Sequence, residues 1–411
     1  MIEKHFEDLE HYQLTAAQVG VHHQRWTAVS EEIDLADIRK IMAEKQYDIL
    51  PVQSDGAITH YYTTLERGKF SAEIEKREIQ AEDKLYYLTQ IEDVMRLFHE
   101  QKRAFFFLWD YQHVLGLISD VNLKSTPVSV YLYTQSNALE IALSKLFLLA
   151  YDEKEFKEIV WKNAKTIENV EDRNKRLEEL EKLFERHAEE QMSNEHLHLI
   201  EQLSLRDLFD VLRKQGWLKP FGYKNKPLKT ISKLIKNVRN YISHPVRDSI
   251  SNEDMLKFLA HTRELIAVIA KAELGVHYRK THYKVKGHEV PIEIGKPLPE
   301  SLKKLCKSEQ GWCFITAFNP ASKSLDPDIN QLLNAQLKSE LQALDLQLFE
   351  AQGESTTSDH LPELSFWVPD IGKEKAEELG LKYGQNAIVY GQPKGLAELL
   401  MLNLEVNNSN V

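Results

Sequence analysis

The chain has 411 residues, of which 42% are hydrophobic and 28% are charged, and its formal net charge is −11. This length exceeds what one ordinary core needs, so we expect two or three globular domains. The acidic balance excludes a protein that coats nucleic acid with its whole surface. The longest apolar run, residues 141–151, is interrupted by Lys145 and is too short to cross a bilayer, so no membrane association is expected.

No apolar segment follows a basic start, which predicts a cytoplasmic protein without a signal peptide. The two cysteines, Cys306 and Cys313, have no second pair to complete a zinc site, so we expect free thiols. Three histidines, His187, His196 and His198, lack the carboxylate or cysteine spacing of a metal site and are expected at the surface. The sequence therefore predicts no bound metal.

Residues 1–133 carry one element pattern twice, in the order helix, strand, turn, strand. The first copy comprises residues 35–45, 49–52, 54–56 and 57–64. The second copy comprises residues 91–99, 104–109, a turn near Asp110, and 114–120. The highly charged segment between the copies, residues 66–84, predicts a solvated helix or a linker.

The second copy ends in Gly116-Leu-Ile-Ser119-Asp-Val-Asn122. This pattern and the repeat resemble a pair of cystathionine-β-synthase (CBS) domains, or Bateman module. The resemblance implies that the Ser119 hydroxyl contacts a nucleotide phosphate and that Asn122, at a position where the family has Asp, lies near the ribose. Thr63 and Glu66 occupy the matching offsets in the first copy. An adenine nucleotide is thus the expected regulatory ligand, and a dimerisation module with an empty cleft is the alternative.

Residues 134–275 read as almost wholly helical. Ser136 is a candidate N-cap for the first helix, and Ser251 for the last one. Gly275 is placed to end that last helix. A bundle of helices is therefore expected between the repeat and the C-terminal part.

The stretch from residue 213 to residue 247 holds ten Lys or Arg and no Asp or Glu, a local reversal of the charge of the chain. Basic groups suit phosphates and aromatic faces suit unstacked bases, so the stretch predicts a surface for single-stranded RNA. Its candidate RNA-binding residues are Trp217, Lys219, Tyr223, Lys224, Lys226, Lys229, Lys233 and Lys236.

Near the end of this stretch lies Arg239-Asn-Tyr-Ile-Ser-His244. An Arg can hold a phosphate through two hydrogen bonds, and a His can move protons near neutral pH. The pattern resembles the motif of the HEPN ribonucleases. The resemblance implies metal-independent RNA cleavage by Arg239, Asn240 and His244, with Glu140 of the first helix facing the site. It also implies a symmetric homodimer in which the two motifs face each other, with no cofactor required.

Two other readings stay open for the same residues. A helix-end His beside a solvated Arg also matches so short a pattern, and the protein would then be a non-catalytic scaffold that senses nucleotides or binds RNA. Alternatively, any activity resides in the C-terminal domain. The sequence contains no phosphate-binding glycine loop and no Gly-x-Ser-x-Gly elbow, so nothing indicates ATP hydrolysis or a serine hydrolase.

Residues 276–411 alternate between strand and helix patterns in the order β-α-β-α-β, which predicts a small α/β domain. They resemble a bacterial domain family of unknown function that carries Ile-Thr-Ala-x-Asn-Pro and a terminal Gly-Gln-Asn-Ala-Ile-Val. The candidate polar set comprises Thr316, Asn319, Asn330, Glu363, Gln385 and Asn386. These residues either gather a ligand at strand ends or satisfy turns and caps. The whole chain is thus expected to be a multidomain α+β protein: a CBS-like pair (1–133), an all-α HEPN-like bundle (134–275) and a small α/β domain (276–411).

Overall fold

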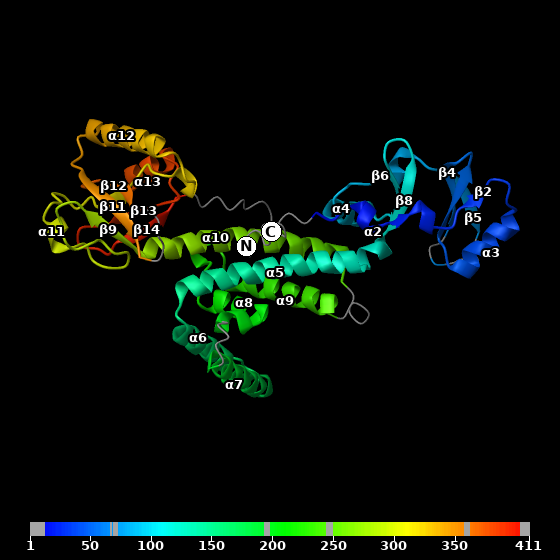
Figure 1. The fold of residues 1–411 in the computed structure, drawn as a ribbon, viewed down its shortest axis with the longest axis horizontal. Coiled ribbons are helices and arrows are strands. Elements are labelled where there is room, and N and C mark those ends of the chain that lie inside the picture. Colours follow the sequence, from blue (N-terminus) through cyan, green and yellow to red (C-terminus); the bar gives the residue numbers. More distant parts are fainter. Residues whose placement is uncertain are drawn as a thin grey trace. The chain divides into compact units, whose positions relative to one another are not determined.

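The computed structural model describes residues 13–65, 68, 73–192, 198–243, 250–356 and 362–402 (Figure 1). The chain divides into two compact units, which we describe separately. The first unit comprises residues 1–142, 204–209 and 225–266, and the second comprises residues 143–203, 210–224 and 267–411. Helices and three sheets are both present, so the predicted mixed α+β class is confirmed. Within the described ranges, no helix has the length and apolar character needed to cross a membrane.

The predicted repeat is confirmed in the first unit. One copy consists of β2 (Val29–Ser30), α3 (Leu35–Lys45), β3 (Ile49–Ser54) and β4 (Ala57–Thr64). The other consists of β6 (Lys84–Tyr86), α4 (Ile91–Gln101), β7 (Phe105–Trp109) and β8 (Val114–Ser119). In each copy the first two strands are parallel across a helix and the last two form an antiparallel hairpin. The copies contact each other through aromatic rings, because Tyr61 of β4 lies 5.3 Å from Phe107 of β7 between ring centroids.

Each copy gains a further strand at the edge of its sheet. β5 (Ile74–Glu78) pairs with β4, so the prediction of a helix or linker throughout residues 66–84 is wrong. Four of its five residues are charged and exposed, which fits an edge strand that must not pair with other chains. β1 (Val21–His22) pairs with β8, where a Cβ on Gly116 would lie 2.5 Å from the Val21 carbonyl oxygen. Glycine at position 116 therefore allows the two backbones to approach.

The helical part contains six long helices among the described residues. They are α5 (Thr126–Ala150), α6 (Glu153–Lys165), α7 (Val170–Met192), α8 (Leu205–Lys214), α9 (Asn225–Ser243) and α10 (Asn252–Arg279). α5 begins eleven residues earlier than predicted, and Ser136 is a buried interior residue rather than an N-cap. The earlier start is possible because Pro127 lies in the first helical turn, where its missing N–H costs nothing.

α10 begins as predicted, with the backbone N–H of Asp254 donating to the Ser251 hydroxyl at 3.0 Å. It does not end at Gly275 but continues to Arg279. A glycine inside a helix costs only about 1 kcal/mol relative to alanine, and the extra turn carries Tyr278 to the C-terminal sheet. His187 also differs from expectation, since it is buried and its Nε2 lies 2.7 Å from the Glu153 carboxylate. His198 caps a short 3-10 turn, and His196 lies outside the described residues.

The second unit contains a six-stranded sheet in the order β14-β13-β10-β12-β11-β9, with all neighbours antiparallel. Its strands are β9 (Thr281–Val285), β10 (Trp312–Ile315), β11 (Phe349–Ser355), β12 (Glu363–Pro369), β13 (Ala387–Gly391) and β14 (Glu398–Met401). Two helices cross between strands, α12 (Pro327–Ala343) after β10 and α13 (Lys373–Lys382) after β12, and a short α11 (Glu300–Lys303) precedes β10. The central elements thus form a split β-α-β, ferredoxin-like arrangement.

Alternation of side chains explains how this sheet is covered on both faces. Cys313 and Ile315 of β10 point to the core formed with α12 and α13, whereas Trp312 and Phe314 point to the core formed with residues 292–306. The predicted α/β order missed β11 and β14, and β11 is hard to recognise because Phe349 is its only large apolar side chain. With β11 included, the class of this domain is antiparallel α+β rather than α/β.

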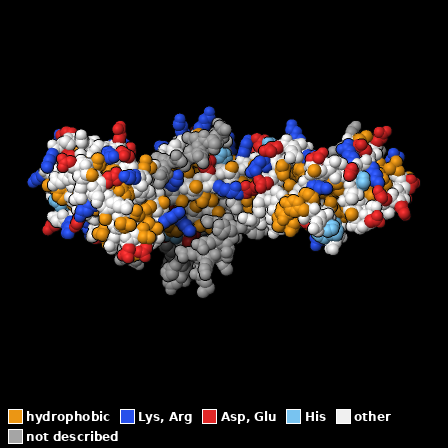
Figure 2. All heavy atoms as spheres, turned by 90° about the horizontal axis from the view of Figure 1, so that it is seen from above, with side chains coloured by type: hydrophobic (Ala, Val, Ile, Leu, Met, Phe, Trp, Pro, Cys, Tyr) orange, Lys and Arg blue, Asp and Glu red, His pale blue; other side chains and the backbone are white. Residues whose placement is uncertain are grey.

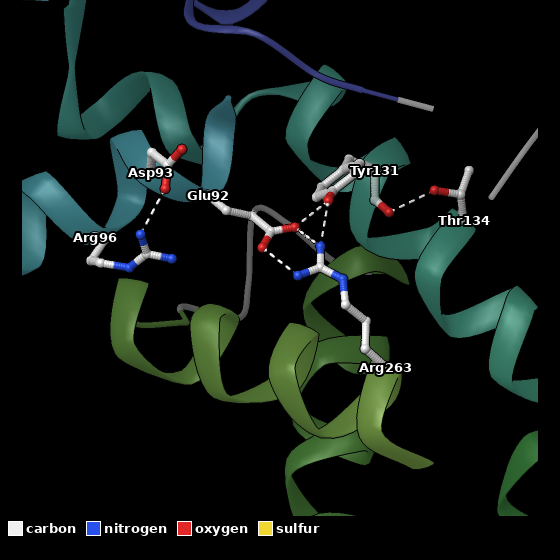
Figure 3. Close-up of polar contacts among 6 residues, drawn as sticks. All are labelled: Glu92, Asp93, Arg96, Tyr131, Thr134 and Arg263. Carbon is white, nitrogen blue, oxygen red and sulfur yellow. Dashed lines mark hydrogen bonds and ion pairs between the residues drawn. The ribbon is translucent and has the colours of Figure 1, made fainter. Parts of the chain in front are cut away.

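A polar contact joins the second repeat to the helices within the first unit (Figure 3). Glu92 lies in the first turn of α4, and its carboxylate accepts hydrogen bonds from the Arg263 guanidinium of α10 and from the Tyr131 hydroxyl of α5. The side chain of Glu92 is only 15% exposed, and burial together with the Glu92 charge raises the pKa of Tyr131. The carboxylate is therefore satisfied by a cation and a phenol that come from two different helices.

Replacing Arg263 with Met should lower the free energy of unfolding by about 1–3 kcal/mol, because the poorly exposed Glu92 carboxylate would lose two hydrogen bonds from the guanidinium. The control is Arg96→Met, which removes the exposed pair with Asp93 on the same helix and should cost less than about 0.5 kcal/mol. Chemical denaturation of both variants measures the difference. Equal losses would show that the Arg263 contact does not stabilise the first unit.

Candidate functional site

α9 presents two opposite faces. Its buried side chains are Leu228, Ile231, Ile235, Val238 and Tyr241. Its exposed lysines are Lys226, Lys229, Lys233 and Lys236, called the lysine face from here on. Spacings of three and four residues keep these lysines on one side of the helix. In the described part of the chain none of the four forms an ion pair, whereas Figure 2 shows acidic and basic side chains interspersed over the visible surface.

Arg239 and Glu140 meet beyond the lysine face. The Arg239 guanidinium lies 3.6 Å from the Glu140 carboxylate of α5, and both side chains are partly buried. Burial raises the pKa of Glu140, the nearby Asp207 charge raises it further, and Arg239 opposes both. Asn240 is exposed in the same turn. A cation that can bind phosphate thus lies beside an acid whose proton is held more firmly than usual.

His244 lies outside the described residues, as do residues 245–249. The described helix α9 ends at Ser243. Any role of His244 in proton transfer therefore rests on the sequence, while the positions of Glu140, Arg239 and Asn240 come from the structure.

The other RNA-binding candidates belong to the second unit. Lys219 and Lys224 are exposed. The Trp217 indole N–H donates to the Tyr151 hydroxyl at 2.9 Å, and the ring contacts Phe147 and Tyr151. Tyr223 is partly buried. Trp217 thus contributes to the packing of its own unit, and stacking on RNA bases by Trp217 or Tyr223 stays a prediction.

The candidate nucleotide residues of the second repeat lie at the end of β8. The Asn122 Oδ1 accepts from both the backbone N–H and the hydroxyl of Ser119, at 2.7 and 2.8 Å. This capping box starts the 3-10 turn Asp120–Lys124 that leads into α5. In the first repeat the Thr63 hydroxyl donates to the Thr64 carbonyl, and Glu66 lies outside the described residues. Ser119 and Asn122 are therefore adjacent, and in this state they bind each other.

The polar set of the C-terminal domain converges at one end of the sheet. β10 is antiparallel to both β12 and β13, so the residues after Ile315 lie beside the first residues of those two strands. Asn319 lies at the centre, where its backbone N–H donates to the Asn330 Oδ1 and its Nδ2 donates to the Glu363 Oε1. The structure thus brings together residues that sequence analysis placed on separate segments.

Most of these amides hold the loop after β10. The Thr316 hydroxyl donates to the Leu364 carbonyl at 2.7 Å, and the Gln385 Nε2 donates to the Phe318 carbonyl at 3.0 Å. Asn330 is buried and returns a hydrogen bond from its Nδ2 to the Asn319 Oδ1. The alternative reading, in which polar residues satisfy turns, accounts for Thr316, Asn330 and Gln385.

The same loop stores backbone strain. Asn319, Ala321 and Ser322 have φ values of 44°, 54° and 57°. Asparagine tolerates this left-handed region, whereas alanine and serine adopt it at a cost. The strained turn brings the Ser322 hydroxyl to 2.8 Å from the Asn386 Nδ2. Such outliers persist where the surroundings enforce them, often at ligand sites.

Sequence analysis missed two residues of this site, Ser322 and Tyr278. Tyr278 belongs to the last turn of α10, although the sequence assigned it to a β-rich segment. Burial and the charge of Glu363 raise its pKa, and hydrogen bonds from Ser322 and Asn386 partly oppose this. The sequence did not predict this position of Tyr278, because α10 was expected to end at Gly275 and instead continues past it. Among the residues that the structure describes, no cluster of three or more His, Cys, Asp or Glu could hold a metal ion.

Comparison with known proteins gives the following matches. Residues 315–388 match the family described as a protein of unknown function, DUF3293, which confirms the resemblance predicted for this part of the chain. A hemolysin-like protein containing a CBS domain, from Oenococcus oeni PSU, is 20% identical, with coverage of 30% of this chain and 93% of that chain and a TM-score of 0.21.

CBSX2 in complex with AMP is 15% identical, with coverage of 28% of this chain and 97% of that chain and a TM-score of 0.23. The search of curated proteins found no match. The segment similar to DUF3293 contains every member of the C-terminal polar set: Thr316, Asn319, Asn330, Glu363, Gln385 and Asn386.

Proposed function

We propose that this protein binds single-stranded RNA on the lysine face of α9 and cleaves it without a metal beside Arg239, under the control of an adenine nucleotide bound by the N-terminal repeat. The observation that carries the proposal is that the lysine face and Arg239 lie on the same helix, α9, and that Arg239 meets Glu140 of α5. The active form would be a homodimer in which two such helices face each other.

The lysine face supplies the binding. Ten residues separate Lys226 from Lys236, and at the helical rise this makes about 15 Å of positive surface. The surface belongs to a chain of net charge −11, so RNA would be directed to this face rather than to the protein as a whole. Phosphates bound there would release counterions, which makes the affinity fall with salt.

Arg239 and Glu140 would supply part of the chemistry, and their contact supports this role. Arg239 would stabilise negative charge on the phosphate as the RNA 2′-hydroxyl attacks it. Glu140 holds the guanidinium in place, and its raised pKa suits exchange of a proton. His244 would take the 2′-hydroxyl proton or protonate the leaving 5′-oxygen, and Asn240 would orient it. The products are a 2′,3′-cyclic phosphate and a 5′-hydroxyl, and all atoms come from the RNA.

The N-terminal repeat would sense the nucleotide. Ser119 and Asn122 lie at the entrance to α5, and the same helix carries Tyr131 and Glu140. A phosphate bound at the Ser119 hydroxyl would compete with the Asn122 side chain for that hydroxyl. The turn that starts α5 would then change, and the change could reach Glu140 through a continuous helix.

A second function is a nucleotide-sensing or RNA-binding scaffold without catalysis. The contact between Arg239 and Glu140 favours it, since a guanidinium that already faces a carboxylate is less available to act on a phosphate. The two functions share the lysine face and differ in whether Arg239 acts on the phosphate.

His244→Ala and Arg239→Ala should each reduce cleavage of single-stranded RNA by roughly two to four orders of magnitude, since each would remove a group that acts in the transition state. The assay contains EDTA and identifies the 2′,3′-cyclic end. His113→Ala, at an exposed histidine of the repeat, is the control and should keep full activity. Undiminished cleavage by His244→Ala, or equal cleavage of DNA, would leave the scaffold function.

Reversing the charge of Lys229, Lys233 and Lys236 to Glu should weaken RNA binding by at least tenfold and flatten its dependence on salt concentration. The matched control reverses Lys162, Lys175 and Lys182 of α6 and α7, which changes the net charge equally. Fluorescence anisotropy at several salt concentrations measures both. Equal weakening by the two triple variants would mean that α9 has no special part in binding.

AMP, ADP, ATP or a cyclic dinucleotide should bind the wild-type protein in calorimetry. Asn122→Asp should bind the preferred nucleotide more tightly, because a carboxylate keeps the cap of Ser119 and adds an acceptor for ribose hydroxyls. Asn122→Ala is the control, because it loses both the cap of Ser119 and the acceptor for ribose hydroxyls. No heat with any nucleotide would assign the repeat a purely structural role.

A further inference from the structure

The turn between β7 and β8 of the second repeat holds Tyr111 in an unfavourable backbone conformation. Its φ is 76°, and within the described residues it is the only aromatic residue with a positive φ. Asp110 enforces the turn, because its Oδ1 accepts from the backbone N–H groups of Gln112 and His113 at 2.9 and 2.7 Å. A bulky side chain in this region is an outlier. A tyrosine therefore stabilises this turn less than glycine or asparagine would.

The first repeat shows that the fold does not require aromatic residues here. Its hairpin, between β3 and β4, turns through Asp55-Gly56, residue types that suit a positive φ at both positions. The last paired residues of the parallel strands also differ. They are Ser30 and Gln53 in the first repeat and Tyr86 and Trp109 in the second. The aromatic side chains at this end of the sheet thus distinguish the second repeat from the first.

Four of these side chains form a continuous surface cluster, called the aromatic cluster from here on. The ring centroids lie 5.1 Å apart for Trp109 and Tyr111, 4.9 Å for Tyr111 and Tyr86, and 5.1 Å for Tyr86 and Tyr87. All four residues are at least partly exposed. Tyr111 is 66% exposed, more than any other large hydrophobic side chain in the described part of the chain. A contiguous exposed patch of this kind indicates a binding surface.

The ring angles indicate which shape of ligand fits the cluster. Tyr86 and Tyr111 stack on each other at 29°, which uses one face of each ring within the cluster. Trp109 is inclined at 60° to Tyr111, and Tyr87 at 70° to Tyr86. A nucleic-acid base needs a free, flat ring face. Two inclined rings instead leave a trough between them, which suits a small puckered ring such as that of proline.

The charge of the cluster also favours an uncharged ligand. The Lys84 Nζ lies 5.2 Å from the centroid of the Trp109 ring, and Asp110, in the turn, carries the opposite charge. Surfaces for RNA rely on several Lys or Arg, as the lysine face of α9 does. One cation balanced by one carboxylate does not supply that field, whereas a neutral apolar peptide needs none.

We propose that the aromatic cluster binds a proline-rich segment of a partner protein in the polyproline II conformation. Proline rings would lie in the two troughs, one beside Tyr111 and one beside Tyr86. Prolines three residues apart are separated by about 9 Å in this helix, a spacing that the centroid distances of the cluster allow. The helix has no internal hydrogen bonds, so its carbonyls can accept from tyrosine hydroxyls and an indole N–H.

Fluorescence anisotropy with the full chain and a labelled, capped ten-residue polyproline peptide tests the proposal. The peptide should bind saturably at submillimolar protein concentrations. A labelled Gly-Ser peptide of the same length, which is flexible and lacks proline rings, should bind at least tenfold more weakly. This comparison needs no variant.

Tyr111→Asn should weaken binding of the polyproline peptide by at least tenfold, because it removes the ring at the centre of the cluster. Asparagine tolerates a positive φ, so the turn is expected to stay intact, which the melting temperature checks. Trp109→Leu, a second variant, should weaken binding similarly. Tyr133→Asn is the matched control, since Tyr133 of α5 is a 55% exposed tyrosine outside the cluster, and it should bind like the wild type.

Equal affinity of the wild type and Tyr111→Asn for the polyproline peptide would overturn the proposal. The absence of saturable binding, or equally tight binding of the Gly-Ser peptide, would do the same. A labelled oligouridine should bind the wild type and Tyr111→Asn alike, because RNA is proposed to bind on α9. Loss of oligouridine binding in Tyr111→Asn with unchanged polyproline binding would assign the cluster to bases instead. The peptide site and the proposed function therefore stand or fail separately.

Discussion

The partly buried carboxylate of Glu92 connects three helices of the first unit. It lies in the first turn of α4 in the second repeat and binds Arg263 of α10 and Tyr131 of α5 (Figure 3). A carboxylate this poorly exposed needs a cation and hydrogen-bond donors. Here Tyr131, 39 residues later in the chain, and Arg263, 171 residues later, supply them. Folding of the repeat and docking of these helices are therefore linked through one charge.

This link gives the proposed regulation a physical route. Ser119 and Asn122 cap the turn that enters α5, Tyr131 binds Glu92 a few residues later, and Glu140 meets Arg239 further along the same helix. A helix without a break transmits a change at its start more directly than a chain of loops does. The allosteric claim requires two arrangements of this helix, and nucleotide and RNA would each favour one of them.

Periodicity predicted most elements, because it reflects burial of one face. The buried residues Leu228, Ile231 and Val238 of α9 recur at helical spacing, which leaves the lysines of this helix on the outside. The predictions were wrong where an element depends on contacts with distant parts of the chain rather than on its own periodicity. β5 is charged and exists through pairing with β4, and α10 passes Gly275 because its last turn packs in the C-terminal domain. The local sequences of β5 and of the end of α10 do not indicate that β4 and the C-terminal domain are their partners.

The candidate sites divide in the same manner. The convergence of Asn319, Asn330 and Glu363 followed from strand ends, once the strands were antiparallel neighbours. The sequence could not tell whether these residues hold the loop or bind a ligand, since both roles use the same side-chain amides. Tyr278 and the backbone strain at Ala321 and Ser322 became visible only in three dimensions.

The central claim is that RNA is bound on α9. Ultraviolet cross-linking of a uridine-rich single-stranded RNA to the full chain, followed by peptide mapping, tests it most directly. Cross-links should concentrate in peptides from residues 225–243, and a tenfold excess of unlabelled RNA should remove them. Cross-links confined to the N-terminal repeat or to the C-terminal sheet, with none on α9, would contradict the account.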